Sequence, residues 1–329
     1  MYESHYGLTA KPFQLRPDPS FFFGSRGHKR AMAYLDYGMS QGEGFIVITG
    51  EVGAGKTTLV RNLFRKLASE RIYAVHIANT HLDADDILRM VAAGFALPHE
   101  GVSKTALLTQ IEELLRHIEQ QGKRALLVVD EAQNLTVRAV EELRMLSNFQ
   151  SADKSLLQTF LLGQPEFRKT LMSPGMQQLR QRVIATYHLG PIDPAETRSY
   201  IEHRLQLVGW RGHPAISAAA FEAIHAASGG IPRRINSLCD RLFLMGYLEE
   251  LESFDQSDVA TVVADIAQEF DSADSDGDTG TGIHAPAPSA LEQMDARIAG
   301  IERSVISVLD AMKGLLNARR TAPSGSDKP

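Results

Sequence analysis

The sequence has very little cysteine and no long apolar run. Cys239 is the single cysteine among 329 residues, which excludes an intrachain disulfide and a metal site built from several thiolates. We expect it to be a small buried residue in a protein of a reducing compartment. No apolar run approaches the roughly 18–20 residues that a membrane span needs. Residues 1–5 also lack the basic start of a secretion signal, so we expect a cytoplasmic protein.

A strong excess of either charge is missing as well. Residues 1–264 hold 28 Lys and Arg against 29 Asp and Glu, whereas residues 265–329 hold 6 against 11. The near-neutral first part argues against a general nucleic-acid binder, although it leaves room for local basic patches. A content of 43% hydrophobic and 22% charged residues is ordinary for a soluble globular protein, and the length allows two domains.

The most informative motif is a complete phosphate loop of the form G-x-x-x-x-G-K-[ST]. It follows the apolar run Phe45–Thr49 directly, and the helical pattern Thr57–Ala68 follows it in turn. Such a strand–loop–helix context lets backbone N–H groups and the helix N-terminus bind phosphate oxygens. We expect a nucleoside triphosphate to contact Gly50, Glu51, Val52, Gly53, Ala54, Gly55, Lys56, Thr57 and Thr58. Lys56 would reach the terminal phosphates and Thr57 would bind Mg²⁺.

A second motif ends another apolar run at Asp130 and Glu131. With a phosphate loop in the same sheet, Asp130 is expected beside the Mg²⁺ ion. Glu131 is expected to orient and deprotonate a water that attacks the γ-phosphate. Two acids at a strand end are often merely solvated, but their combination with the phosphate loop indicates hydrolysis.

Five apolar runs alternate with helical patterns and predict an α/β fold with a five-stranded, mainly parallel sheet covered by helices on both faces. The predicted strands are Phe45–Thr49, Ile72–Ala78, Ala125–Val129, Leu156–Leu162 and Val183–Leu189. After Pro191 only helical patterns follow, near 194–209, 215–227, 233–250 and 256–269. The break at Gly229–Pro232 precedes the third of them.

Polar residues at two further strand ends are candidates for regulation. Gln164 could contact the γ-phosphate or the attacking water, and a turn before the helix starting at Pro165 is an equally good interpretation. Asn79 could hydrogen-bond Glu131 and hold it inactive until a partner binds, and capping of the next helix is the competing role.

The chain divides into six predicted segments. They are an extended arm with aromatic anchors (1–24), the sheet domain (25–190), a small all-helical domain (191–270), an acidic flexible linker (271–289), an amphipathic coiled-coil helix (290–318) and a disordered tail (319–329). The helix 290–318 has apolar residues at spacings of three and four. It should pair with a second copy or a protein partner, or else pack back on the body.

Together these motifs resemble an AAA+ ATPase, which is a P-loop NTPase of the ASCE type. The resemblance rests on the phosphate loop, Asp130–Gln133, Gly163–Glu166, Leu179–Val183 and Gly230–Asn236, and it extends over residues 1 to about 270. More narrowly, the chain is similar to the general secretion pathway protein A group and to relatives encoded beside exosortase (PEP-CTERM) and exopolysaccharide genes. The sequence lacks that group's transmembrane segment and peptidoglycan-binding region, so the exosortase-associated branch fits better.

The resemblance implies roles that spacing alone does not assign. ATP would be the nucleotide, in keeping with the absence of an Asn-Lys-x-Asp guanine motif. Arg233 matches the position from which the helical lid reaches a bound triphosphate. Arg180 and Arg182 lie where the family places an arginine finger that completes a neighbouring subunit's site in a homo-oligomer, and a surface salt bridge is the competing role.

These inferences predict an ATP-hydrolysing switch or motor that serves an envelope export or exopolysaccharide system, with Mg²⁺ as cofactor and a protein partner on the C-terminal helix. It would act from the cytoplasmic side, peripheral to the inner membrane through its partners. Two alternatives stay open. One is a DNA-associated ATPase of the transposition-helper or initiator kind, which the charge balance opposes. The other is a slow ATP-dependent scaffold, which Glu131 opposes.

Overall fold

A computed structural model describes residues 1–67, 71–78, 83–152 and 154–274. The chain forms two compact units, Met1–Val259 and Ala260–Pro329, and the boundary falls inside helix α12 (Gln256–Asp274). The sheet and the candidate site lie within the first unit. Among the described residues, no helix is both long and apolar enough to span a membrane.

The centre of the fold is a five-stranded sheet in which every pairing is parallel, as the sequence predicts. Across the sheet the order is β2 (Ile72–Ile77), β3 (Arg124–Val129), β6 (Leu157–Gly163), β1 (Phe45–Gly50) and β7 (Val183–Leu189). The strand β6 thus lies between the strand that precedes the phosphate loop and the strand that precedes Asp130. All three strands therefore carry their terminal polar residues to one edge of the sheet.

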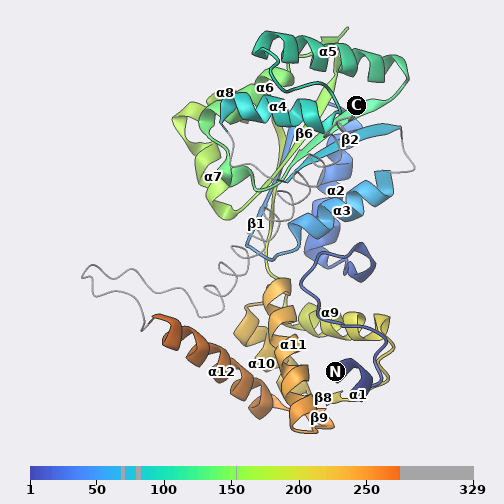
Figure 1. Ribbon diagram of the computed structural model, residues 1–329, viewed down its shortest axis with the longest axis vertical. Helices are drawn as coiled ribbons and strands as arrows, with labels where there is room; N and C mark the ends of the chain where they lie inside the picture. The colour runs from blue at the N-terminus through green and yellow to red at the C-terminus, as the bar shows by residue number, and fades with distance from the viewer. Residues whose placement is uncertain (68–70, 79–82, 153, 275–329) are drawn as a thin grey trace, which may run out of the picture. The chain divides into compact units, whose positions relative to one another are not determined.

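Helices cover both faces of this sheet (Figure 1), which explains why its inner strands are mostly apolar. In β1, Phe45 and Val47 pack on one side, whereas Ile46 and Ile48 pack on the other. The first side is covered by α4 (Ala84–Gly94), α5 (Lys104–Gln120), α6 (Val137–Leu146) and α7 (Pro165–Met172). The second side is covered by α2 (Arg26–Gln41) and α3 (Lys56–Leu67).

Short elements connect these layers. They are the 3₁₀ helices Ala132–Asn134 and Pro174–Met176, the helix α8 (Gln177–Arg180), and the strands β4 (Gln150–Ser151) and β5 (Lys154–Ser155). The two strands pair with each other in antiparallel fashion immediately before β6.

The segment after Pro191 contains the predicted helices α9 (Pro194–Leu207), α10 (Ala218–Ser228) and α11 (Pro232–Leu248). Asp193 begins α9 as predicted, because its Oδ1 accepts a hydrogen bond from the Glu196 backbone N–H at 2.8 Å. The segment is not purely helical, however. Two-residue strands β8 (Ala215–Ile216) and β9 (Ser253–Phe254) pair in parallel, and so short a bridge leaves no alternating pattern in the sequence.

The N-terminal arm is anchored by its aromatic residues, as expected. Phe13 is buried with its ring centroid 5.4 Å from that of Phe243 in α11, and the Phe23 ring lies 5.7 Å from Tyr200 in α9. The arm nevertheless begins with a helical turn, α1 (Tyr2–His5), and contains the 3₁₀ helix Pro19–Phe21. The buried Tyr2 fixes the first turn, because its hydroxyl donates to Asp240 at 2.5 Å.

The C-terminal predictions are tested only in part. Helix α12 ends at Asp274 and so extends four residues into the predicted linker, where the sequence offers no glycine or proline to stop it before Gly277. The remaining linker and the predicted coiled-coil helix 290–318 lie outside the described residues, as does the tail 319–329.

Candidate functional site

The phosphate loop leaves β1 at Gly50 and enters α3 at Lys56, the strand–loop–helix order that its motif requires. Gly53 and Gly55 have φ angles of 81° and 99°, a region that strongly favours glycine. The Ala54 N–H donates to the Glu51 carbonyl at 3.1 Å and closes the turn. Glu51 is exposed, whereas Val52 and Thr58 are half-buried.

Lys56 is buried beneath this loop. Its Nζ donates to the carbonyl oxygens of Gly50 at 2.7 Å and Glu51 at 3.0 Å. Burial lowers the pKa of the Lys56 ammonium, and the carboxylates of Glu131 and Asp130 oppose that shift. The ammonium is thus held inside the curve of the loop, where a phosphate would meet it.

The two sequence motifs meet at Thr57 and Asp130. The Thr57 hydroxyl donates to Asp130 Oδ2 at 3.0 Å across 73 positions of sequence. Burial raises the pKa of Asp130 and the neighbouring Glu131 carboxylate adds to that shift, whereas the bond from Thr57 opposes it. A hydroxyl and a buried carboxylate are hard oxygen donors of the kind that Mg²⁺ prefers, so the residues present fit this ion.

Glu131 follows with a left-handed backbone, at φ 53° and ψ 38°. Gln133 Nε2 donates to Glu131 Oε2 at 2.5 Å, and Gln164 Nε2 donates to the same oxygen at 3.3 Å. The Gln133 side-chain oxygen in turn accepts from the Gln164 backbone N–H at 2.9 Å. Gln164 therefore precedes α7, as the turn interpretation predicts, and its side chain contacts the candidate base. Its contact with the γ-phosphate or the attacking water stays a prediction. Gln133 was not predicted, although it stands only two residues from Glu131.

His76 is a second residue that the sequence did not single out. It lies near the end of β2, and its Nε2 is 3.9 Å from Asp130 Oδ2. Burial lowers its pKa, while the Asp130 carboxylate opposes that shift. Its position at a strand end, like those of Asp130 and Gln164, was the available signal.

Arg233 is the residue of the helical segment that reaches the phosphate loop. Its backbone N–H donates to the Gly53 carbonyl at 3.2 Å, at the start of α11. A Cβ atom on Gly53 would lie 2.4 Å from the Arg233 Cβ, so only glycine fits this close approach.

His28 contacts the loop at Gly55, two residues beyond the Arg233 contact, and the sequence gave no reason to select it. His28 is buried in the first turn of α2 and hydrogen-bonds to the Ala54 backbone. A Cβ atom on Gly55 would lie 2.6 Å from its Nε2. The loop that His28 contacts lies beyond the rest of α2 and all of β1 in the sequence, and His28 belongs to no short motif.

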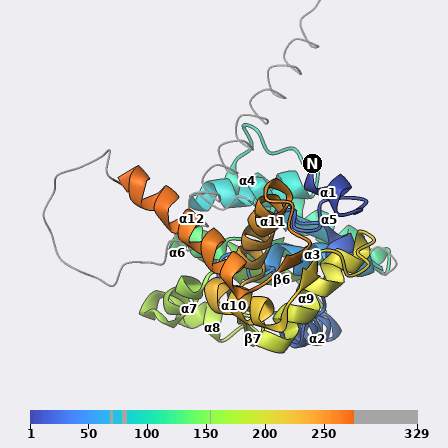
Figure 2. The ribbon, with the colours of Figure 1, turned by 90° about the horizontal axis from the view of Figure 1, so that it is seen from below.

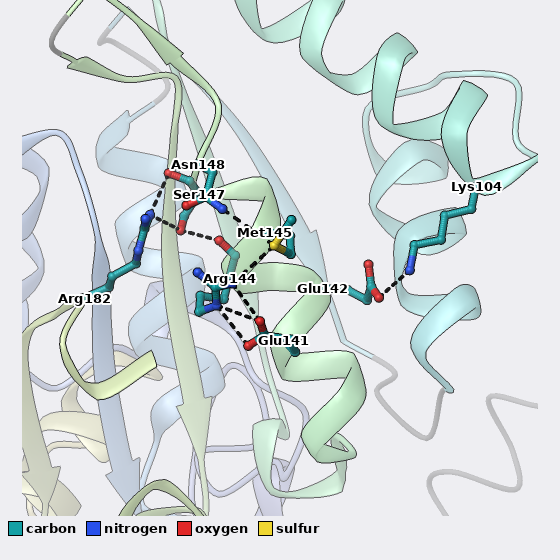
Figure 3. Close-up of polar contacts among 8 residues, drawn as sticks. All are labelled: Lys104, Glu141, Glu142, Arg144, Met145, Ser147, Asn148 and Arg182. Atoms are coloured by element: carbon teal, nitrogen blue, oxygen red, sulfur yellow. Dashed lines mark hydrogen bonds and ion pairs between the residues drawn. The ribbon is translucent and has the colours of Figure 1, made fainter. Parts of the chain in front are cut away.

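Arg180 and Arg182 both bind main-chain oxygens of their own subunit. Arg180 Nη1 donates to the carbonyls of Leu171 at 2.5 Å and Ser173 at 2.8 Å, where α7 ends. Arg182 Nη1 donates to the carbonyl and the hydroxyl of Ser147, just after α6 (Figure 3). The competing prediction of a surface salt bridge was wrong in detail, because the partners are uncharged. The predicted regulatory residue Asn79 lies outside the described residues.

Comparison with known proteins agrees with this geometry. A family model described as an AAA domain matches residues 39–171. General secretion pathway protein A of Aeromonas hydrophila is 36% identical over 269 residues, which make up 81% of this chain and 49% of that protein. The chain thus spans about half the length of the curated relative that it matches.

Solved structures show the same fold at low identity. Cdc6p of Pyrobaculum aerophilum superposes with a TM-score of 0.57 at 16% identity, covering 80% of this chain and 70% of that one. The ORC2 protein of Aeropyrum pernix in its ADP form gives a TM-score of 0.54 at 17% identity, covering 82% and 77%. The chain has the α/β fold of AAA-type P-loop proteins, which is a nucleotide-binding fold.

Proposed function

We propose that this chain binds and hydrolyses ATP as an AAA+ switch or motor. The observation that carries the proposal is the contact between Thr57 and Asp130, because it assembles two separate motifs into one site beside the buried Lys56. The general secretion relative supports an envelope export system as the process served. The exosortase-associated branch stays a narrower prediction, which neighbouring exosortase and polysaccharide genes would support.

Each side chain has a defined task in this proposal. Lys56 neutralises the terminal phosphates, and the glycine loop offers them its N–H groups. Thr57 and Asp130 would hold Mg²⁺, which offsets phosphate charge when it is bound. Glu131 accepts a proton from the attacking water, and Gln133 and Gln164 fix the carboxylate that does so.

Assembly and partners complete the proposal. The segment 191–259 would act as a lid with Arg233 at the phosphates, and Arg180 or Arg182 would exchange its main-chain partners for a neighbour's nucleotide. Both guanidinium groups lie near helix ends, where a rearrangement of one turn would release them. The predicted helix 290–318 would recruit a partner from the cytoplasmic side, and Asn79 would restrain Glu131.

An equilibrium binding experiment tests the site. We expect the full chain to bind ATP with Mg²⁺ and the Lys56→Ala variant to lose at least about tenfold in affinity, which corresponds to about 1.4 kcal/mol. Glu131→Gln is the matched control, because it removes the base and keeps the phosphate contacts. Equal ATP affinity of the wild type and Lys56→Ala would contradict the proposal.

A DNA-associated ATPase is the second candidate, favoured by the fold shared with Cdc6p and ORC2. The balance of 28 basic and 29 acidic residues in 1–264 opposes it. That candidate requires affinity for duplex DNA that falls steeply with salt concentration, whereas the export proposal requires none.

A further inference from the structure

The ring of His28 is fixed between two partners. Its Nδ1 lies 2.7 Å from Ser25 Oγ, and this hydroxyl oxygen also accepts from the His28 backbone N–H at 3.2 Å. The ring also hydrogen-bonds to the Ala54 backbone. A Cβ atom on Gly55 would lie 2.6 Å from the His28 Nε2, so the ring contacts Ser25 through one nitrogen and packs closely on the loop beside the other.

The arm that leads to His28 is fastened to α9 by one buried arginine. Arg204 Nε donates to the Pro12 carbonyl at 2.6 Å, and its Nη2 donates to the Gln14 carbonyl at 3.3 Å. Its guanidinium carbon also lies 4.8 Å from the ring centroid of Phe21. Because a buried cation is stable only when it is well hydrogen-bonded, these contacts define the path of the arm. We call residues 12–28 the strap.

The far end of the strap is attached to the start of α9. The Arg26 backbone N–H donates to Glu196 Oε1 at 2.6 Å, and the Arg26 guanidinium forms an ion pair with Asp193. The Arg26 side chain is 75% exposed, so its ion pair adds little. The strap is therefore joined to α9 at both ends and reaches the phosphate loop just beyond the second.

We propose that His28 is a positioning residue of the phosphate loop, and that the strap transmits the position of α9 to that loop. The inference deepens the proposed ATPase and rests on it. A displacement of α9 relative to the sheet would act on the contacts of Arg204 and Arg26, and the strap that carries them ends at His28 beside Gly55. The Arg61 guanidinium of α3 also donates to the Pro17 carbonyl within the strap. Together with Arg233 at Gly53, the helical segment thus acts on the loop at two glycines, Gly53 and Gly55.

The first test is amide hydrogen exchange of residues 51–55 in the nucleotide-free full chain. We expect His28→Ala to speed exchange about tenfold, as loss of about 1.4 kcal/mol of local protection would. His28→Gln should restore most of the protection, because its amide can still donate and accept. Arg204→Met should also speed exchange, although its side chain contacts the strap rather than the loop.

A matched control separates this effect from general destabilisation. Ile224→Ala removes a fully buried side chain of α10, which is not part of the strap, so it should lower Tm and leave exchange at 51–55 unchanged. Unchanged exchange in His28→Ala would overturn the positioning role. Exchange in Arg204→Met no faster than in Ile224→Ala would overturn the coupling.

ATP binding provides the second readout. His28→Ala and Arg204→Met should each weaken ATP binding about tenfold, and His28→Gln should weaken it about threefold or less. Because hydrogen exchange needs no nucleotide, faster exchange without any ATP binding by the wild type would contradict the ATPase and still support the strap.

Discussion

Glu131 is the residue whose backbone departs most from ordinary geometry at the site. A non-glycine residue in the left-handed region costs about 1 kcal/mol or more, so its surroundings must hold it there. The bonds from Gln133 and Gln164 to its carboxylate do so. The Glu131 carboxylate is thus held by two amide side chains, one from the 3₁₀ helix after β3 and one from the end of β6.

His28 predicts a specific dependence of stability on pH. Burial lowers its pKa from 6.5 to about 4, so the unfolded chain binds more protons between these values. The folded state should lose about 3 kcal/mol from this group as the pH falls from 6.5 to 4, and nothing above about 7. Denaturant unfolding across this range measures the loss.

The His28→Gln variant is the reference for that measurement, because glutamine does not titrate and the carboxylates are common to both chains. As the pH falls, the unfolding free energy of the wild type should decrease relative to that of the variant. Parallel pH profiles would show that the folded protein binds a proton at His28 as readily as the unfolded chain does.

The sequence predicts those site residues that belong to short motifs. Thr57 and Asp130 meet as expected, because the phosphate loop follows β1, Asp130 follows β3, and both strands end at the same edge of the sheet. His28 and Arg204 escaped prediction, since their partners lie about 26 and 190 positions away and no pattern connects them.

Among the elements, α7 and α8 depend on Arg180. The helix α7 ends with carbonyl groups that lack partners within the helix, and the Arg180 guanidinium supplies donors to two residues there. We therefore expect Arg180→Ala to lower the free energy of unfolding by about 1–2 kcal/mol, measured by denaturant unfolding of the isolated subunit at low concentration. The control is Arg168→Ala, which removes an exposed cation of α7 itself.

A role of Arg180 or Arg182 as an arginine finger would affect ATPase activity, separately from any effect on stability. If Arg180 or Arg182 completes a neighbour's site, its alanine variant should lose ATPase activity most strongly at protein concentrations where subunits associate. Full activity of both variants at all concentrations would leave these arginines with only the structural contacts described above.

The five strands were predicted almost to the residue. Burial on both faces makes the inner strands β3, β6 and β1 mostly apolar runs, whereas the edge strands β2 and β7 are only partly buried. The paired strands β8 and β9, and the turn α1, were not predicted. Each is four residues or shorter and owes its conformation to tertiary contacts, such as the bond from Tyr2 to Asp240. Local propensity cannot reveal such elements.

At the scale of the molecule, the phosphate loop is enclosed by parts that are distant in sequence. His28 of α2, Lys56 at the start of α3 and Arg233 of α11 all lie at this loop and belong to one compact unit. Figure 2 shows the helices α9, α10 and α11 in front of the sheet when the molecule is seen from below. A nucleotide-dependent change at the loop would therefore act on the arm and on α11 together.

Glu131 is the residue that would make the proposed site hydrolytic. The most direct measurement is the rate of phosphate release from saturating ATP by the wild type and by Glu131→Gln, at matched ATP occupancy. We expect the variant to be at least about a hundredfold slower, in keeping with loss of a general base. Equal rates in the two proteins would contradict the account.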